Sequence, residues 1–157
     1  MSIFNIFKKK EKINNPCALP IQFNYAPQSE DMIFLLSSYN VFTKTFLDYV
    51  KKCYVKANIA PSFNRSEVLE GIAIDYAFWV FNHCQRLVSA RHSVIENLKK
   101  AVSAEVKYID FEVFRPCPTC SKISKNKTYK ITDNIPIYPC LDCKEDNICI
   151  FSYKSRW

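Results

Sequence analysis

The chain has 157 residues, of which only one is glycine and two are histidine. Phosphate-binding loops and dinucleotide-binding turns need several glycines in a short segment, so P-loop and Rossmann-type chemistry are excluded. No uninterrupted apolar stretch reaches the length of about 18 residues that a membrane-spanning helix needs. Hydrophobic residues nevertheless make up 48% of the chain and aromatic residues 15%. This composition favours a packed core over a disordered chain.

Lysine and arginine outnumber aspartate and glutamate by 22 to 15, which gives a formal net charge of +7. Such a charge permits an anionic partner but does not require one. In the first twelve residues the basic side chains follow the apolar ones, which is not the order of a signal peptide. We therefore expect a cytoplasmic protein with reduced cysteines. Ile3, Phe4, Ile6 and Phe7, followed by Lys8–Lys10, allow weak contact with a membrane surface or docking on the protein itself.

Residues 1–28 form a basic leader in which three prolines favour extended structure. From Met32 to Cys53 apolar residues recur at spacings of three and four, which is typical of one helix face. A second helical pattern starts near Ser66 and runs to Ala101, and we expect a break or kink near Ser89–His92 because an unbroken helix would be unusually long. Ile72–Phe81 is apolar almost all round apart from Asp75, which predicts a buried segment with a partner for Asp75.

From Lys107 onward the pattern changes to the alternation of a strand. Tyr108–Phe114 alternates clearly, and 128–132 and 147–153 are two further short runs of this kind. The change of period places a boundary near residues 104–107, so the chain divides into 1–28, 29–106 and 107–157.

The strongest motif is a pair of C-x₂-C sequences separated by nineteen residues. The first pair is Cys117 and Cys120, and the second is Cys140 and Cys143. Two such turns can direct four thiolates at one ion, and this spacing is typical of a tetrahedral zinc site. Residues 115–155 accordingly resemble a zinc ribbon, which implies one structural Zn²⁺ per chain held between short antiparallel strands. Cys17, Cys53 and Cys84 lack a partner at this spacing, and we expect Cys53 and Cys84 in the core because they lie on apolar helix faces. Cys149 could replace one of the four ligands or be a small buried apolar residue.

These observations predict an α+β fold. It would consist of an N-terminal extended arm, a helical body of two to three long helices, and a C-terminal zinc ribbon. A closed shell of four cysteines leaves no position at which zinc could activate water, so the metal is expected to stabilise the fold.

The segment between the cysteine pairs could bind nucleic acid. Four lysines interleave with one tyrosine, a pattern that suits phosphates and a stacked base: Lys122, Lys125, Lys127, Tyr129 and Lys130. Residues 115–157 contain eight basic but also four acidic side chains, so the net positive charge is small. A solvated surface and an acidic protein partner remain alternatives.

Catalytic residues are harder to find. Arg86 and His92 are similar to the R-x₄₋₆-H motif of HEPN ribonucleases, which would imply RNA cleavage by a dimer. The sequence departs from that motif at Leu87, where the family usually has a polar residue. His83 is followed by Cys84, but neighbouring residues on a helix point about 100° apart, so we expect a structural histidine.

The main prediction is a non-catalytic, zinc-binding interaction protein. Phenylalanine and tyrosine total 21 residues, more than a small helical body can easily bury, and some of them could face a protein partner. An accessory, immunity or defence role in a bacterium or phage is the corresponding biological hypothesis. Nucleic-acid binding is the alternative function, and a HEPN-like ribonuclease is the third.

Overall fold

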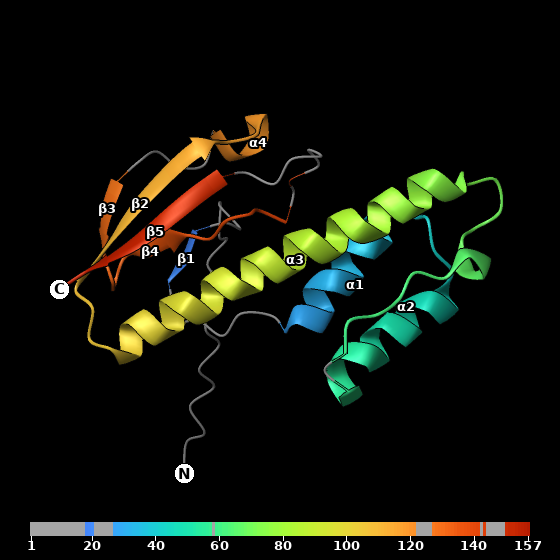
Figure 1. The fold of residues 1–157 in the computed structure, drawn as a ribbon, viewed down its shortest axis with the longest axis horizontal. Coiled ribbons are helices and arrows are strands. Elements are labelled where there is room, and N and C mark those ends of the chain that lie inside the picture. The colour runs from blue at the N-terminus through green and yellow to red at the C-terminus, as the bar shows by residue number, and fades with distance from the viewer. Residues whose placement is uncertain (1–17, 21–26, 58, 122–126, 142, 144–149) are drawn as a thin grey trace, which may run out of the picture.

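The computed structural model describes residues 18–20, 27–57, 59–121, 127–141, 143 and 150–157, and only the backbone of residues 18–20, 57, 119, 120 and 150. Helices are combined with a small antiparallel sheet, so the predicted α+β class is confirmed (Figure 1). The order of elements is β1 (Ala18–Pro20), α1 (Gln28–Tyr39), α2 (Lys44–Lys52), π-helix η1 (Cys53–Ala57), 3₁₀-helix η2 (Arg65–Glu67), α3 (Ile74–Ser103), β2 (Tyr108–Arg115), α4 (Pro118–Ser121), β3 (Lys127–Lys130), β4 (Asn134–Pro136) and β5 (Ile150–Arg156).

The apolar pattern that begins at Met32 is divided between two helices. α1 ends where Asn40 takes a left-handed backbone conformation with a φ of 52°. α2 begins after Thr43, whose hydroxyl accepts a hydrogen bond of 3.2 Å from the N–H of Phe46. The periodicity continues through this turn because both helices direct their apolar faces into the same core.

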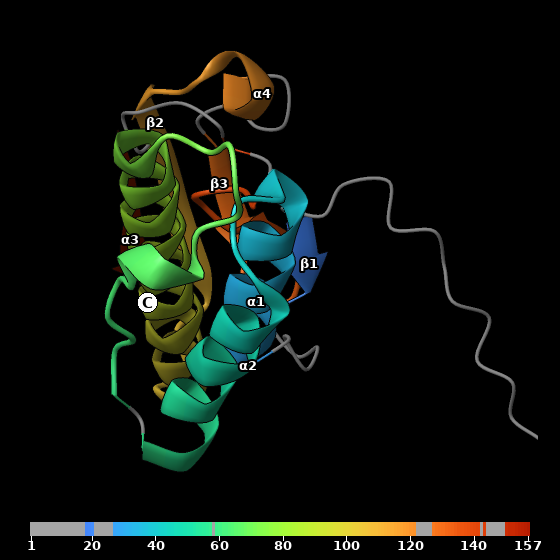
Figure 2. The same ribbon diagram turned by 90° about the vertical axis from the view of Figure 1, so that its right-hand side faces the viewer.

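α3 is an unbroken helix of 30 residues, about 45 Å long. Of the two possibilities predicted near Ser89–His92, a break is therefore wrong. The two halves of α3 have different neighbours: the first half packs beside α1, and the second half packs on the sheet (Figures 1 and 2). One long helix is stable here because each half is covered by a separate layer.

The segment Ile72–Phe81 is not buried all round, which corrects the prediction. α3 starts only at Ile74, after a turn in which Gly71 has a φ of 80°. Asp75 is exposed, and the exposed fractions of Tyr76 and Phe78 are 46% and 51%. Since α1 and α2 lie on one side of these turns, the other side reaches the surface (Figure 2).

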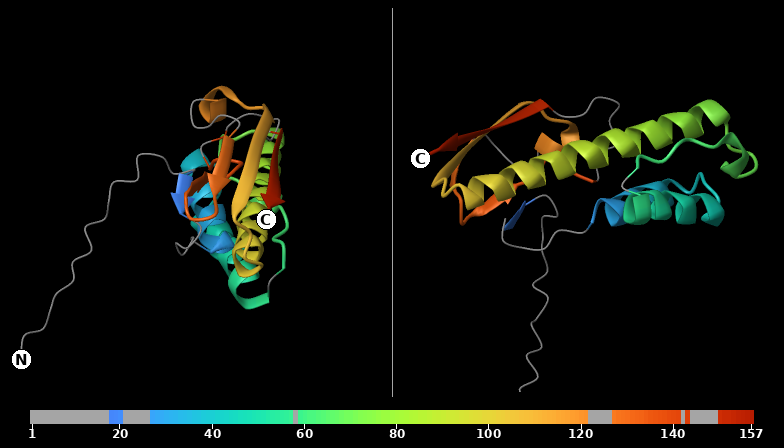
Figure 3. Two further views of the ribbon diagram at one scale, coloured as in Figure 1. Left: turned by 90° about the vertical axis from the view of Figure 1, so that its left-hand side faces the viewer. Right: turned by 60° about the horizontal axis from the view of Figure 1, so that its bottom comes forward.

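Three strands form an antiparallel sheet in the order β3-β2-β5, and β1 pairs with β4 in a separate ribbon. β2 confirms the strand predicted at Tyr108–Phe114, while β3 and β5 overlap the two shorter predicted runs. Ile109 and Phe111 alternate with outward-facing residues and point toward the core. α3 crosses the inner face of this sheet (Figure 3).

The buried residues form two clusters that meet along α3. The larger cluster combines α1, α2 and the first half of α3 with five residues of the C-terminal part: Phe111, Cys117, Tyr138, Cys140 and Cys143. The smaller one lies between the second half of α3 and the strands: Val94, Ile95, Leu98, Ala101, Val106, Ile109, Ile135 and Ile137. The core thus crosses the predicted boundary near 104–107, and the division into 1–28, 29–106 and 107–157 stays a prediction.

In the described part of the chain no helix is both long enough and apolar enough to span a membrane. The leader residues that were considered for contact with a membrane surface lie outside the described residues.

Candidate metal centre

Cys117 and Cys143 lie next to each other in the core, although 26 residues separate them. Cys117 follows β2 and precedes α4, while Cys143 closes a tight turn in which its N–H donates to the carbonyl of Cys140 at 3.1 Å. The Sγ atoms of Cys117 and Cys143 are 3.6 Å apart. Two sulfurs on one tetrahedral zinc at about 2.3 Å would lie about 3.8 Å apart. The spacing of these two thiols therefore fits the predicted metal.

The other two predicted ligands are Cys140 and Cys120. Cys140 is fully buried and is disulfide-bonded. The side chain of Cys120 also lies outside the described part. Among the described residues no group of three or more histidines, cysteines, aspartates or glutamates is arranged to hold a metal. A sulfur in a disulfide is not a thiolate ligand, so zinc binding by all four cysteines requires Cys140 to be reduced.

α3 supports this cysteine cluster through His83, which is only 1% exposed. Its Nε2 lies 2.9 Å from the carbonyl oxygen of Cys143, and because a carbonyl only accepts, Nε2 carries the proton. The ring stacks on Trp79 at 5.0 Å with an interplanar angle of 12°, and Tyr39 meets its edge. His83 is thus a structural, hydrogen-bonded histidine, as predicted, and its contact is with a predicted metal ligand.

Arg91 holds the chain that leads into the second cysteine pair. Its Nη1 donates to the carbonyls of Ile137 at 3.1 Å and Pro139 at 3.3 Å. The side chain is buried, and its Nε lies 3.9 Å from a carboxylate oxygen of Asp31. A buried guanidinium needs such a counter-charge. His83 and Arg91, both on α3, together donate hydrogen bonds to three backbone carbonyls between Ile137 and Cys143.

Asp31 brings α1 into the same network. Its carboxylate lies 2.7 Å from Nε2 of His92, and only 11% of the Asp31 side chain is exposed. No local pattern marks these contacts, since the partners are 46 to 61 residues apart.

The two candidate ribonuclease residues, Arg86 and His92, differ in their exposure. His92 is half-buried against Asp31, whereas Arg86 is exposed. Arg86 lines a pocket of about 390 Å³ with Gln28, Tyr54 and Ser89, among others. In the described part of the structure no hydrogen bond or ion pair joins Arg86 to His92.

The candidate nucleic-acid residues are only partly described, since Lys122 and Lys125 lie outside the described residues. Lys127 and Lys130 are exposed on β3, but Tyr129 is half-buried and meets Phe111 edge-on at 6.5 Å. Burial raises the pKa of the Tyr129 hydroxyl. The face of Tyr129 is occupied in part by Lys127, whose Nζ lies 5.2 Å from the ring centre.

Two groups near the cluster, the buried Cys84 and the half-buried Tyr39, are poor acids. Burial raises the pKa of the Cys84 thiol to about 12. Burial, and then the neighbouring Cys84, Tyr76 and Cys143, raise the pKa of Tyr39 to about 12. Both groups stay protonated at neutral pH, so Cys84 is a core residue there and not a thiolate nucleophile.

The contact between His83 and Cys143 leads to a measurable prediction. His83→Ala is expected to weaken zinc binding about tenfold, the lower end of the range for residues that support a ligand. His83→Gln, which keeps a donor, is expected to retain more of the affinity. Competition of the full chain with a chromophoric chelator measures both values.

Gln85→Ala is the matched control, because Gln85 is two residues away and donates to Pro61 instead. Equal zinc affinity of the wild type and His83→Ala would show that the histidine only fills space.

Comparison of the chain with protein-family models, curated proteins and solved structures finds no match.

Proposed function

We propose that this chain is a zinc-stabilised protein that binds a protein partner. The zinc would be held by Cys117, Cys120, Cys140 and Cys143, and the observation that supports this most is the 3.6 Å approach of two thiols from distant C-x₂-C pairs. Their burial beside α3 fits a metal that holds the fold together. A complete shell of four cysteines offers no open position for a substrate.

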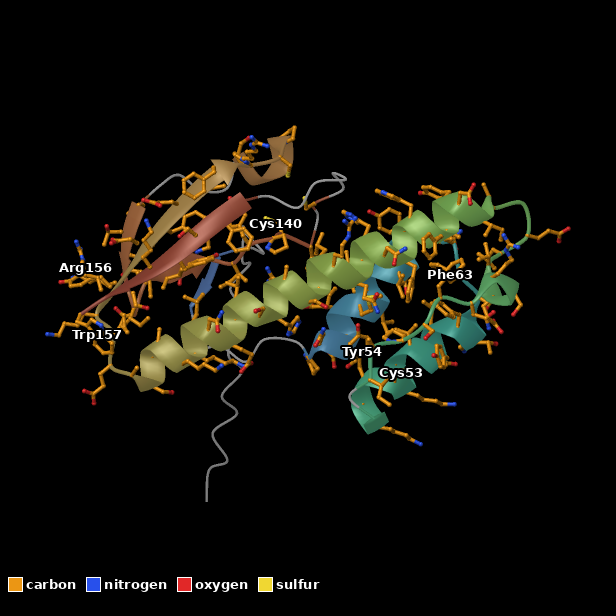
Figure 4. The ribbon with its side chains drawn as sticks, viewed as in Figure 1. Cys53, Tyr54, Phe63, Cys140, Arg156 and Trp157 are labelled. Atoms are coloured by element: carbon orange, nitrogen blue, oxygen red, sulfur yellow. The ribbon has the colours of Figure 1, made fainter. Side chains whose placement is uncertain are left out.

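The partner surface that we propose is the aromatic patch, formed by Tyr49, Phe63 and Phe78. Phe78 and Tyr49 are 51% and 41% exposed, and Phe63 lies against Phe78 with ring centres 5.2 Å apart (Figure 4 shows Phe63 between α2 and α3). Tyr49 and Phe63 also line a pocket of about 450 Å³, with Phe46 at its base. Exposed aromatic residues around a pocket are typical anchors for a protein partner.

Polar groups surround the aromatic patch and give it a rim. Glu67, Asn64 and Thr45 line the same pocket, and the hydroxyl of Tyr49 accepts a hydrogen bond of 3.3 Å from the N–H of Ser62. A hydrophobic centre with a polar rim is the usual anatomy of a protein interface. Nucleic-acid binding through Lys127 and Lys130 is less well supported, because the accompanying Tyr129 is half-buried.

Site-specific photo-crosslinking tests the partner proposal. With p-benzoylphenylalanine in place of Phe78, irradiation of cells that naturally contain the protein is expected to yield a defined protein adduct. The same probe in place of Phe114 is the control, since Phe114 is at least as exposed as Phe78, at 60% against 51%, but lies on β2. Adducts that nuclease removes, or equal adducts from both positions, would contradict the proposal.

A further inference from the structure

β5 is an edge strand with an open side. The sheet order is β3-β2-β5, and within the described residues β5 pairs only with β2 (Figure 3, left). The open side of such a strand presents unpaired N–H and C=O groups, which another extended chain can pair with. β5 is seven residues long, enough to accept a strand of ordinary length.

The usual protection of an edge strand is weak at β5. Charged side chains such as lysine commonly guard an edge. Here Nζ of Lys154 lies 3.2 Å from Glu112, and the guanidinium of Arg156 lies 5.1 Å from the ring centre of Tyr108. Both contacts hold the charges over the outer face of the sheet, so neither side chain is directed across the open edge.

A pocket lies directly beneath this edge, between β5 and α3. Its volume is about 220 Å³. The lining combines alternate residues of β5 with Ile109 of β2 and one face of α3: Phe151, Tyr153, Ser155, Ile109, Val94, Asn97, Leu98 and Ala101. Val94, Leu98 and Ala101 are buried, so the floor is apolar, while Asn97 and Ser155 are exposed at the rim.

The walls of the pocket are fixed in place. The hydroxyl of Tyr153 donates to the carbonyl of Pro136 and accepts from the N–H of Tyr138 at 3.1 Å. The second half of α3 is held by its own packing on Ile135 and Ile137. A pocket with fixed walls can receive a side chain without paying for rearrangement.

We propose that β5 and this pocket bind an extended segment of a partner protein, as an added strand. The backbone of the segment pairs with the open edge of β5, and one of its apolar side chains enters the pocket below. Main-chain pairing combined with a side-chain pocket is an established mode of peptide recognition. This surface is separate from the aromatic patch, so the inference goes beyond the proposed function.

The charge around the pocket indicates the chemistry of that segment. Arg156 and Lys107 are exposed at the end of β5, where the N–H of Lys107 donates to the carbonyl of Arg156 at 3.3 Å (Figure 4 shows Arg156 and Trp157 at this end). Lys100 is exposed in the last turn of α3, beside Ala101 of the pocket, and Glu105 is an exposed acidic residue between α3 and β2. Acidic residues beside the apolar anchor would complement them. A second copy of this chain fits less well, because β5 has two basic residues and no acidic one, and the whole chain is positively charged.

Selection from a phage library of random twelve-residue peptides, with the full chain as target, tests this inference. We expect enriched peptides in which apolar residues alternate and acidic residues flank them. Binding of such a synthetic peptide should slow hydrogen exchange of the amides of residues 150–156. No enrichment, or protection only elsewhere in the chain, would overturn the proposal.

A pair of variants locates the binding site. Ala101→Leu fills the pocket and is expected to weaken peptide binding at least about tenfold. Ala104→Leu makes the same change three residues later at an exposed position outside the pocket, and should leave the affinity unchanged. If Ala101→Leu does not fold, Asn97→Trp blocks the exposed rim instead.

Two other results would overturn the proposal: equal peptide affinity in the pocket-blocking variant and Ala104→Leu, or a dimer in sedimentation whose formation protects β5 in place of the peptide. Crosslinking from Phe78 is unaffected by either result, so this proposal and the proposed function can fail separately.

Discussion

Cys143→Ser is expected to abolish zinc binding and to destabilise the whole chain, including its helices. Cys143 is 1% exposed and belongs to the same buried cluster as α1, α2 and the first half of α3. Its carbonyl is also the acceptor of His83. Because binding energy at a structural zinc site is folding energy, its loss should cost several kcal/mol, a large part of the roughly 5–15 kcal/mol that stabilises a domain.

The measurement combines metal content with thermal unfolding. Reduced wild-type protein should contain one zinc per chain, and Cys143→Ser none. The helical signal in circular dichroism at 222 nm should fall together with the resistance of residues 107–157 to protease. Cys53→Ser is the control, because Cys53 lies on η1, away from the cluster, and the variant should keep both zinc and stability (Figure 4).

Two outcomes would contradict this expectation. One is that wild-type protein treated with a reductant binds no zinc and keeps Cys140 in a disulfide, which would mean that the four cysteines form an oxidised cluster instead of a metal site. Full retention of the helices in a variant whose residues 107–157 are digested would mean that the chain divides into two independent parts near residue 107, as its change of sequence period predicts.

The sequence allowed prediction of elements whose pattern is local. β2 follows from strict alternation at Tyr108–Phe114, and the helical class of residues 29–106 follows from spacings of three and four. The turn at Asn40 and the full length of α3 do not follow in this way. Apolar periodicity continues across Asn40, and the continuity of α3 depends on a sheet that covers its second half, which only the tertiary fold supplies.

The candidate metal centre shows the same limit. Cys117, Cys120, Cys140 and Cys143 stand out because their spacing is a property of neighbouring residues. The side chains that hold the backbone of Ile137, Pro139 and Cys143, around the second cysteine pair, come from α3, 46 to 60 residues away, and have no sequence signature. Asp75 stands out in the sequence as a charge in an apolar stretch but is exposed, whereas among the residues that the structure describes the buried charges are Asp31 and Arg91.

Arg91 should therefore be the most sensitive charged residue of the chain. Arg91→Met is expected to lower the free energy of unfolding by about 3–5 kcal/mol, the usual cost of breaking a buried ion pair. The substitution leaves the carboxylate of Asp31 with His92 alone, and it removes the donor to the carbonyls of Ile137 and Pro139. Both consequences loosen the link between α1, α3 and the segment before Cys140.

Urea unfolding followed by circular dichroism measures this cost. Arg86→Met is the matched control on the same helix, and because Arg86 is exposed, its loss should change stability by less than about 0.5 kcal/mol.

The double variant Asp31→Asn with Arg91→Met separates the two causes of the expected loss, the broken ion pair and the lost hydrogen bonds to the carbonyls. If the ion pair dominates, the loss of unfolding free energy in the double variant is smaller than the summed losses of Asp31→Asn and Arg91→Met, by at least about 1 kcal/mol. Additive losses would assign the cost to the two carbonyls, and equal stability of Arg91→Met and Arg86→Met would show that the buried network does not hold the layers together.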